Sequence, residues 1–139
     1  MRGARGGGVR RLAILVVDDE EDILELLSEM LRGHEVVRAT GCEEAEAVML
    51  RRGASLDAVV SDYRMPGRNG AEVLRAAMQH SPRAVRALLT ACPPSDVGDL
   101  VDAGVVHFCL LKTFINALRG RLEAIVSSAE GVASQAAPG

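Results

Sequence analysis

Short apolar segments alternate along the chain with stretches in which apolar residues recur every three or four positions. The apolar segments are six or seven residues long, and the first stops directly at acidic residues. Such segments are typical of strands buried on both faces of a parallel sheet. They predict strands over residues 11–17, 34–39, 56–61, 84–90 and 105–111.

The stretches between these segments have the spacing of amphipathic helices. In the first of them Leu27, Met30 and Leu31 continue a stripe that begins at Ile23, and Gly33 supplies the helix end. The expected helices cover residues 20–32, 43–52, 71–80, 96–103 and 114–128.

Strand and helix therefore alternate five times, which predicts parallel strands joined by right-handed helical crossovers. The expected fold class is α/β, a single doubly wound sandwich. We assign this domain to residues 11–128. The Gly-rich residues 1–10 are expected to be a flexible segment, and residues 129–139 a flexible tail or the start of a linker.

Composition narrows the class of protein. Of the 139 residues, 48% are hydrophobic and 25% are charged, which indicates a globular domain and not a disordered chain. The net charge of -3 argues against a general nucleic-acid surface. A basic arm at Arg2, Arg5, Arg10 and Arg11 is the less favoured alternative. We expect no direct nucleic-acid partner.

The number and spacing of the cysteines and the length of the apolar segments predict where in the cell the protein is located. Cys42, Cys92 and Cys109 form no even set and lack the spacing of a metal site. This pattern favours a reducing, cytoplasmic environment. No segment approaches the roughly 18 apolar residues of a membrane span, so no membrane association is expected.

Candidate chemistry collects where the predicted strands end. Asp18 and Asp19 follow the first strand, Asp62 the third, Thr90 ends the fourth and Lys112 follows the fifth. In an open parallel sheet, ligands bind outside the carboxyl ends of the strands. We therefore expect three carboxylates, a hydroxyl and an ammonium group to meet at one edge.

Converging carboxylates repel one another unless a cation lies between them. Hard oxygen ligands suit Mg²⁺, which would also attract a phosphoryl donor and neutralise charge during in-line transfer. Thr90 and Lys112 on the flanking strands could each bind one oxygen of a phosphoryl group on the central strand. That geometry favours Asp62 as the nucleophile.

Each residue also has an ordinary structural explanation. Adjacent acids before a helix often cap it and favour its dipole, and a lone lysine is most often solvated. Four such coincidences at four correct strand ends are improbable when taken together, and this favours the functional interpretation.

Several ordered motifs carry a resemblance to a known family. Asp18-Asp19-Glu20, Asp62-x-x-Met65-Pro66-Gly67-x-x-Gly70, Thr90-Ala91 and Lys112, each at a strand end, resemble the receiver domains of response regulators, including the chemotaxis regulators. The resemblance covers roughly residues 11–127. It implies a flavodoxin-like (βα)5 fold with strand order 2-1-3-4-5.

The resemblance also implies roles for individual residues. Asp18, Asp19 and Asp62 would hold Mg²⁺, with Asp19 as a direct ligand and the main-chain carbonyl of Arg64 completing the shell. Asp62 would accept a phosphoryl group from a sensor histidine kinase or a phosphotransfer protein, and Thr90 and Lys112 would bind its oxygens.

The expected output is a changed surface on the fourth helix, fifth strand and fifth helix. That surface would face a downstream effector domain or protein. The chain would then be a signalling phosphoacceptor that catalyses only its own phosphorylation and dephosphorylation, not an enzyme in the ordinary sense.

The chain departs from the family pattern at two positions. Thr113 follows the lysine where the family has a proline in a cis peptide bond, and we expect a trans bond here. Cys109 stands where the family has its switch aromatic. Phe108 is one residue earlier and should face the opposite side of the strand, because the side-chain period is two.

Other functions stay open. One, which the departures at Thr113 and Cys109 motivate, is a degenerate receiver that docks to proteins without phosphorylation. A second is a Mg²⁺-dependent phosphatase with an aspartyl nucleophile, although Asp18-Asp19-Glu20 lacks the second aspartate at the required spacing. Flavin or dinucleotide binding is set aside, since the loop after the first strand is acidic and has no glycine.

Overall fold

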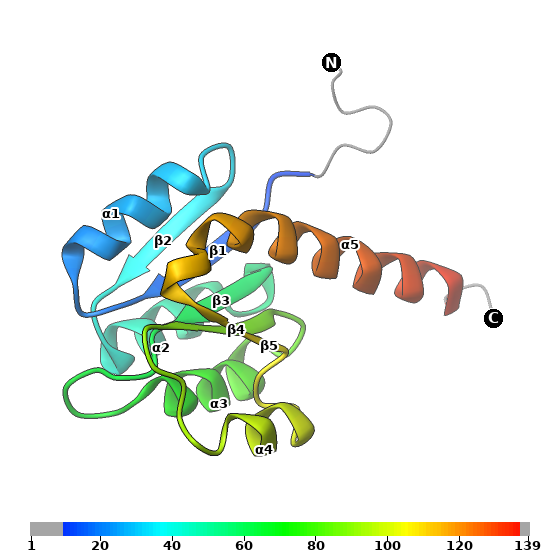
Figure 1. The fold of residues 1–139 in the computed structure, drawn as a ribbon. Helices are drawn as coiled ribbons and strands as arrows, with labels where there is room; N and C mark the ends of the chain where they lie inside the picture. Colours follow the sequence, from blue (N-terminus) through cyan, green and yellow to red (C-terminus); the bar gives the residue numbers. More distant parts are fainter. Residues whose placement is uncertain (1–9, 137–139) are drawn as a thin grey trace.

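Five parallel strands form one sheet in the order β2-β1-β3-β4-β5, as predicted (Figure 1). The structure is a computed structural model and describes residues 10–136. The strands are β1 (Ala13–Val17), β2 (Glu35–Ala39), β3 (Ala58–Ser61), β4 (Val85–Thr90) and β5 (Phe108–Leu111). Strands β1 and β3 are neighbouring inner strands, so their carboxyl ends lie side by side at one edge of the sheet.

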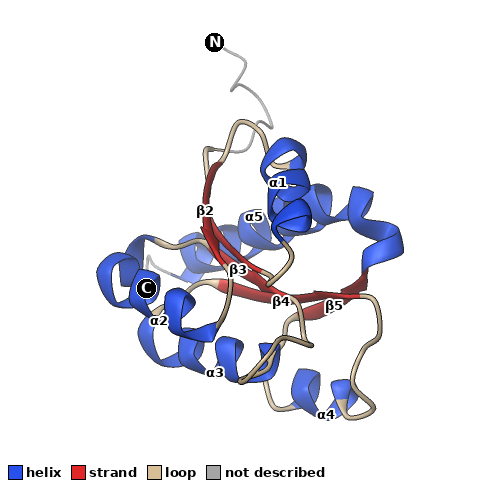
Figure 2. Ribbon diagram, turned by 90° about the vertical axis from the view of Figure 1, so that its left-hand side faces the viewer, coloured by secondary structure: helices blue, strands red, loops and turns tan. Residues whose placement is uncertain are grey.

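Helices cover both faces of this sheet. They are α1 (Glu21–Met30), α2 (Cys42–Arg52), α3 (Gly70–His80), α4 (Val97–Asp102) and α5 (Leu118–Ala136), with short 3-10 turns at η1 (Gly53–Ser55) and η2 (Lys112–Ala117). Helices α1 and α5 lie on one face, and α2, α3 and α4 lie on the other (Figure 2). The predicted doubly wound sandwich is confirmed.

The alternation of side chains along β1 divides the core in two. Leu15 and Val17 pack toward α2 and α3. Ile14 and Val16 pack toward α1 and α5. All four side chains are buried, which explains why the first strand is a continuous apolar run.

The fifth strand is shorter than predicted because it begins at Phe108 and not at Val105. The main-chain N–H groups of Val105 and Val106 donate to the carbonyl of Leu100, at 2.9 and 3.3 Å. These two residues close the end of α4, so their β-branched side chains do not extend the strand.

The last helix also differs from its prediction. Residues 112–117 form the 3-10 turn η2, and α5 then continues to Ala136 (Figure 1). Helix α5 therefore extends beyond the predicted end at residue 128, and the expectation that residues 129–139 form a flexible tail or the start of a linker stays a prediction. Small residues in this stretch include several alanines, the residue with the highest helix propensity, so a lack of apolar periodicity did not exclude a helix.

Two further expectations concern the chain ends and the backbone. The segment 1–10 lies outside the described residues except for Arg10, whose guanidinium is ion-paired with Asp57 at 2.7 Å. The described part of the chain contains no cis peptide bond, so Thr113 follows Lys112 through a trans bond as expected. Within the same part, no helix is long and apolar enough to cross a membrane.

Candidate functional site

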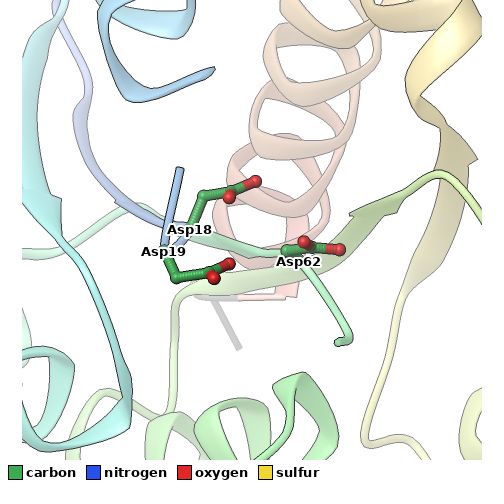
Figure 3. Close-up of side chains that lie close together, drawn as sticks. All are labelled: Asp18, Asp19 and Asp62. Atoms are coloured by element: carbon green, nitrogen blue, oxygen red, sulfur yellow. The ribbon is translucent and has the colours of Figure 1, made fainter. Parts of the chain in front are cut away.

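Three aspartates meet at the carboxyl edge of the sheet (Figure 3). Asp18 and Asp19 follow β1, and Asp62 follows β3. One carboxylate oxygen from each lies within 4.8 Å of the others. Asp18 and Asp62 are 2% and 8% exposed, whereas Asp19 is exposed to solvent. The predicted convergence of these side chains is confirmed.

Main-chain hydrogen bonds beyond the strand ends hold two of these residues in place. The N–H of Asp18 donates to the carbonyl of Ala39 at 3.1 Å, and that of Asp62 donates to Val17 at 2.9 Å. The hydrogen bonding between strands thus continues through the first acid after β1 and after β3. The backbone of the site is part of the sheet and not of a free loop.

Lys112 supplies the cation that the sequence placed at this edge. Its Nζ lies 2.9 Å from Oδ2 of Asp18 and 3.2 Å from Oδ2 of Asp62. One ammonium group therefore bridges the two buried carboxylates. Asp19 makes no ion pair among the residues that the structure describes, which leaves three carboxylates facing one positive charge.

Burial and charge shift the pKa values of this cluster. Burial raises the pKa of Asp18, against the lowering effect of the Glu20 N–H group and of Lys112, and the charge of Asp62 raises it further. Burial lowers the pKa of Lys112, but the hydrogen bond and charge of Asp18 together with Asp62 outweigh this, so its pKa is raised. Lys112 is therefore a cation at neutral pH.

Thr90 lies at the end of β4, and its side chain is almost completely buried. Its Oγ1 donates to the carbonyl of Cys92 at 3.5 Å, a long contact within the loop after the strand. The structure therefore brings Thr90 to the carboxyl edge of the sheet without pairing its hydroxyl to an aspartate. Arg64 is exposed in the loop after Asp62, and the role expected for its carbonyl stays a prediction.

Gly70 is a site residue whose importance the sequence indicated only through the motif. A Cβ atom added to Gly70 would lie 2.2 Å from the carbonyl oxygen of Asp62, closer than any side chain can approach. The Gly70 N–H also donates to the carbonyl of Tyr63 at 2.8 Å, and Asn69 caps the helix that follows. The loop after Asp62 can fold back on itself only because residue 70 has no side chain.

Strand β5 presents its side chains as the period of two predicts. Phe108 packs in the core under α1 and α5. Cys109 packs on the opposite face, against the core that includes Leu88, its register partner in β4. The position of the family's switch aromatic is thus occupied by a small, half-buried thiol.

Comparison with protein families identifies a matching domain. The model for the response regulator receiver domain matches residues 14–123. A hydrogenase transcriptional regulatory protein, HoxA of Cupriavidus necator, is 29% identical over 73% of this chain and 21% of its own length. A response regulator receiver protein of Anaeromyxobacter is 40% identical over 55% of this chain and 32% of its own length. The chain thus spans a third or less of these relatives.

Solved structures agree with the family match. A receiver domain from Clostridium thermocellum has a TM-score of 0.74 at 25% identity, covering 87% of this chain and 98% of that one. The non-phosphorylated receiver domain of HemR from Leptospira biflexa has a TM-score of 0.73 at 28% identity, covering 84% and 95%. Since the family match extends over most of the chain, the protein belongs to the response regulator receiver domains of two-component signal transduction.

Proposed function

We propose that Asp62 accepts a phosphoryl group from a histidine kinase or phosphotransfer protein in a Mg²⁺-dependent reaction. The observation that carries this proposal is the position of Asp62 between its neighbours. Its carboxylate lies 3.2 Å from the Lys112 ammonium and within 4.8 Å of the two acids after β1. A nucleophilic carboxylate needs this combination of a nearby cation and a metal-binding set of oxygens.

The residues present fit a magnesium ion. Three carboxylates supply hard oxygen ligands, and Lys112 neutralises only one of their three charges. Asp18, Asp19 and Asp62 would hold the ion, with the carbonyl of Arg64 completing the set. When bound, Mg²⁺ would neutralise charge on the phosphoryl group.

The protein's own groups would orient the incoming phosphoryl group. Lys112 already lies against Asp62 and can pair with one phosphoryl oxygen as the new charge appears. Thr90 would have to exchange its long contact with Cys92 for a hydrogen bond to another oxygen. That exchange would move the loop after β4 and alter the surface formed by α4, β5 and α5, to which an effector domain or protein would bind.

Intact mass after incubation with Mg²⁺ and a small acyl-phosphate donor tests the proposal. The wild-type chain should gain one labile phosphoryl group, and neither the Asp62→Asn variant nor the wild type without metal should gain it. Asn keeps the size of the side chain, so circular dichroism should show the same fold. Phosphorylation of the variant at another residue would contradict the assignment.

A docking module that works without phosphate is the second candidate, and Cys109 is the observation that favours it. The face of β5 that would carry the switch aromatic holds a thiol, and the nearby Phe108 is committed to the other core. No aromatic side chain on this face of β5 would move together with Thr90. Phosphorylation of Asp62 could therefore leave the surface formed by α4, β5 and α5 unchanged. An effector that binds wild type and Asp62→Asn equally, with and without phosphate, would support this function.

A further inference from the structure

Four arginines surround a pocket at the edge of the sheet opposite the aspartates. Arg10 and Arg11 precede β1, Arg52 ends α2 and Arg83 precedes β4. The pocket is open and has a volume of about 410 Å³. We name it the basic pocket. It lies at the amino ends of the strands, because each of its arginines comes shortly before a strand.

Two acids share the basic pocket and are already engaged. Asp57 accepts from Arg10 at 2.7 Å, from Arg83 at 2.8 Å and from the N–H of Ala13 at 2.8 Å. Its side chain is only 4% exposed, so its oxygens are taken up by the protein. Glu35 is held by both terminal nitrogens of Arg52, each at 2.9 Å.

The arginines therefore carry more charge than the acids neutralise. Among the described residues that line the basic pocket, four guanidinium groups and two carboxylates sum to a charge of +2, in a chain whose net charge is -3. The Arg11 guanidinium has no hydrogen bond or ion pair with any residue between 10 and 136. Arg83 uses Nε on the carbonyl of Ala54 and Nη2 on Asp57, which leaves donors on Nη1.

Ion pairs within the pocket fix the guanidinium groups of Arg10, Arg52 and Arg83 before any ligand arrives. Arg52 is held on both sides, by Glu35 and by the hydroxyl of Ser55 at 3.2 Å. Guanidinium groups bind phosphate oxygens with paired hydrogen bonds, and groups that are already oriented lose less entropy on binding. The volume suits a small molecule, whereas an extended nucleic acid would need a longer basic stripe.

We propose that the basic pocket binds a small anion with two or more linked phosphate groups, without a metal ion. The basic pocket lies apart from Asp62 and from the two other clustered aspartates, Asp18 and Asp19. Binding there is therefore independent of the proposed phosphorylation. Free polyphosphate and the phosphate chain of a nucleotide share the recognised chemistry. The pocket's net charge favours a ligand that carries several negative charges over a single phosphate.

Calorimetric titration tests whether the basic pocket binds linked phosphates. The protein is titrated with tripolyphosphate and, separately, with ATP, both at low salt and in the presence of EDTA. EDTA removes metal from the aspartate cluster, whose charge then repels phosphate, so binding reports the basic pocket. We expect saturable binding with one site, equal in the Asp62→Asn variant and weakened by salt. Equal affinities for the two ligands would identify the phosphate chain as the ligand, and tighter ATP binding would identify a nucleotide.

The matched variants are Arg11→Gln and Arg75→Gln, which remove the same charge. The Arg11 guanidinium lines the pocket and is unpaired among residues 10–136, so its loss should weaken binding about fivefold without destabilising the fold. Arg75 is exposed on α3, outside the pocket, and its loss should change affinity little. Binding that does not saturate, or equal losses in both variants, would overturn the proposal.

Discussion

The guanidinium of Arg121 lies over the ring of Phe108, 4.4 Å from its centroid. This cation–π contact joins α5 to β5 on the face turned away from Thr90. Phe108 is therefore fixed by α5 and cannot serve as the aromatic partner of the loop after β4 without a slip of the strand. Its neighbour Cys109 occupies the position of the switch aromatic. The two side chains lie on opposite faces of β5 and cannot exchange places.

The burial of Cys109 predicts the order in which the cysteines react. Burial raises the pKa of Cys109 and that of Cys42, although the nearby Arg68 opposes the effect at Cys42. Cys92 is exposed in the loop after β4. Mass spectrometry during iodoacetamide treatment of the folded protein should show Cys92 alkylated first.

The three thiols should react at similar rates in urea, which serves as the control for reagent access. Alkylation of Cys109 as fast as that of Cys92 in the folded protein would mean that β5 separates from its neighbours. Such opening would remove the argument that Cys109 is a packed, unreactive residue.

Metal binding should depend more on Asp19 than on Thr90. Asp19 is one of the three clustered carboxylates, whereas the Thr90 hydroxyl donates to a loop carbonyl. We expect Asp19→Ala to weaken Mg²⁺ binding at least about tenfold and Thr90→Ala to change it little. Tyr63, the chain's single tyrosine, adjoins Asp62, so its fluorescence offers a readout in a chain without tryptophan.

Asp102→Ala at the end of α4 is the matched control, because it removes the same charge from a residue outside the cluster. Equal losses in the Asp19 and Thr90 variants would contradict the ranking. An equal loss in the Asp102 variant would mean that net charge, and not ligation, governs affinity.

The strand ends explain why the site could be predicted from the sequence. A parallel sheet aligns the carboxyl ends of its strands, so Asp18, Asp62 and Lys112 had to meet once the order of strands was known. The faces of Phe108 and Cys109 followed from the period of two in the same way. Both inferences rest on regular geometry that depends little on the rest of the chain.

Contacts between distant segments could not be predicted in this way. Asp57 and Arg10 are separated by 47 positions, and no local pattern marks them as partners. Val105 and Val106 have strand-like side chains, but their N–H groups close the end of α4. In each case tertiary hydrogen bonds decide the structure, and propensity along the chain does not report them.

Gly70→Ala should directly disturb the loop that follows Asp62. The added Cβ would meet the Asp62 carbonyl at 2.2 Å, which neither backbone segment can accept without moving. We expect a loss of about 1–3 kcal/mol in the free energy of unfolding, measured in urea, and a lower yield of phosphoryl adduct.

Gly98→Ala in α4 is the control for this substitution. Gly98 has no atom within 4 Å of an added Cβ, and Ala favours a helix over Gly by up to about 1 kcal/mol. This variant should be as stable as wild type or slightly more so. A Gly70→Ala variant as stable as Gly98→Ala would mean that the loop can relax without strain.

Acid stability should depend on Asp57. Burial raises the pKa of Asp57, but the hydrogen bond from Arg10, the Ala13 N–H and the charges of Arg10 and Arg83 outweigh it, so the pKa lies below its ordinary value of 3.8. A carboxyl group with a lowered pKa in the folded state stabilises the fold above its unfolded pKa. This contribution is lost as the pH falls below 3.8 and through the folded value.

Asp57→Asn should therefore be less stable than wild type by about 1–3 kcal/mol at pH 7, since it removes a buried, charge-assisted set of hydrogen bonds. The difference should shrink as the pH falls below 3.8, where wild type also loses the charge. Urea unfolding at a series of pH values measures both effects. Because the Arg10 and Arg83 side chains are themselves 44% and 55% exposed, salt should also reduce the difference. A difference that stays constant across the acid range would show that the packing of residue 57, and not its charge, stabilises the amino ends of the strands.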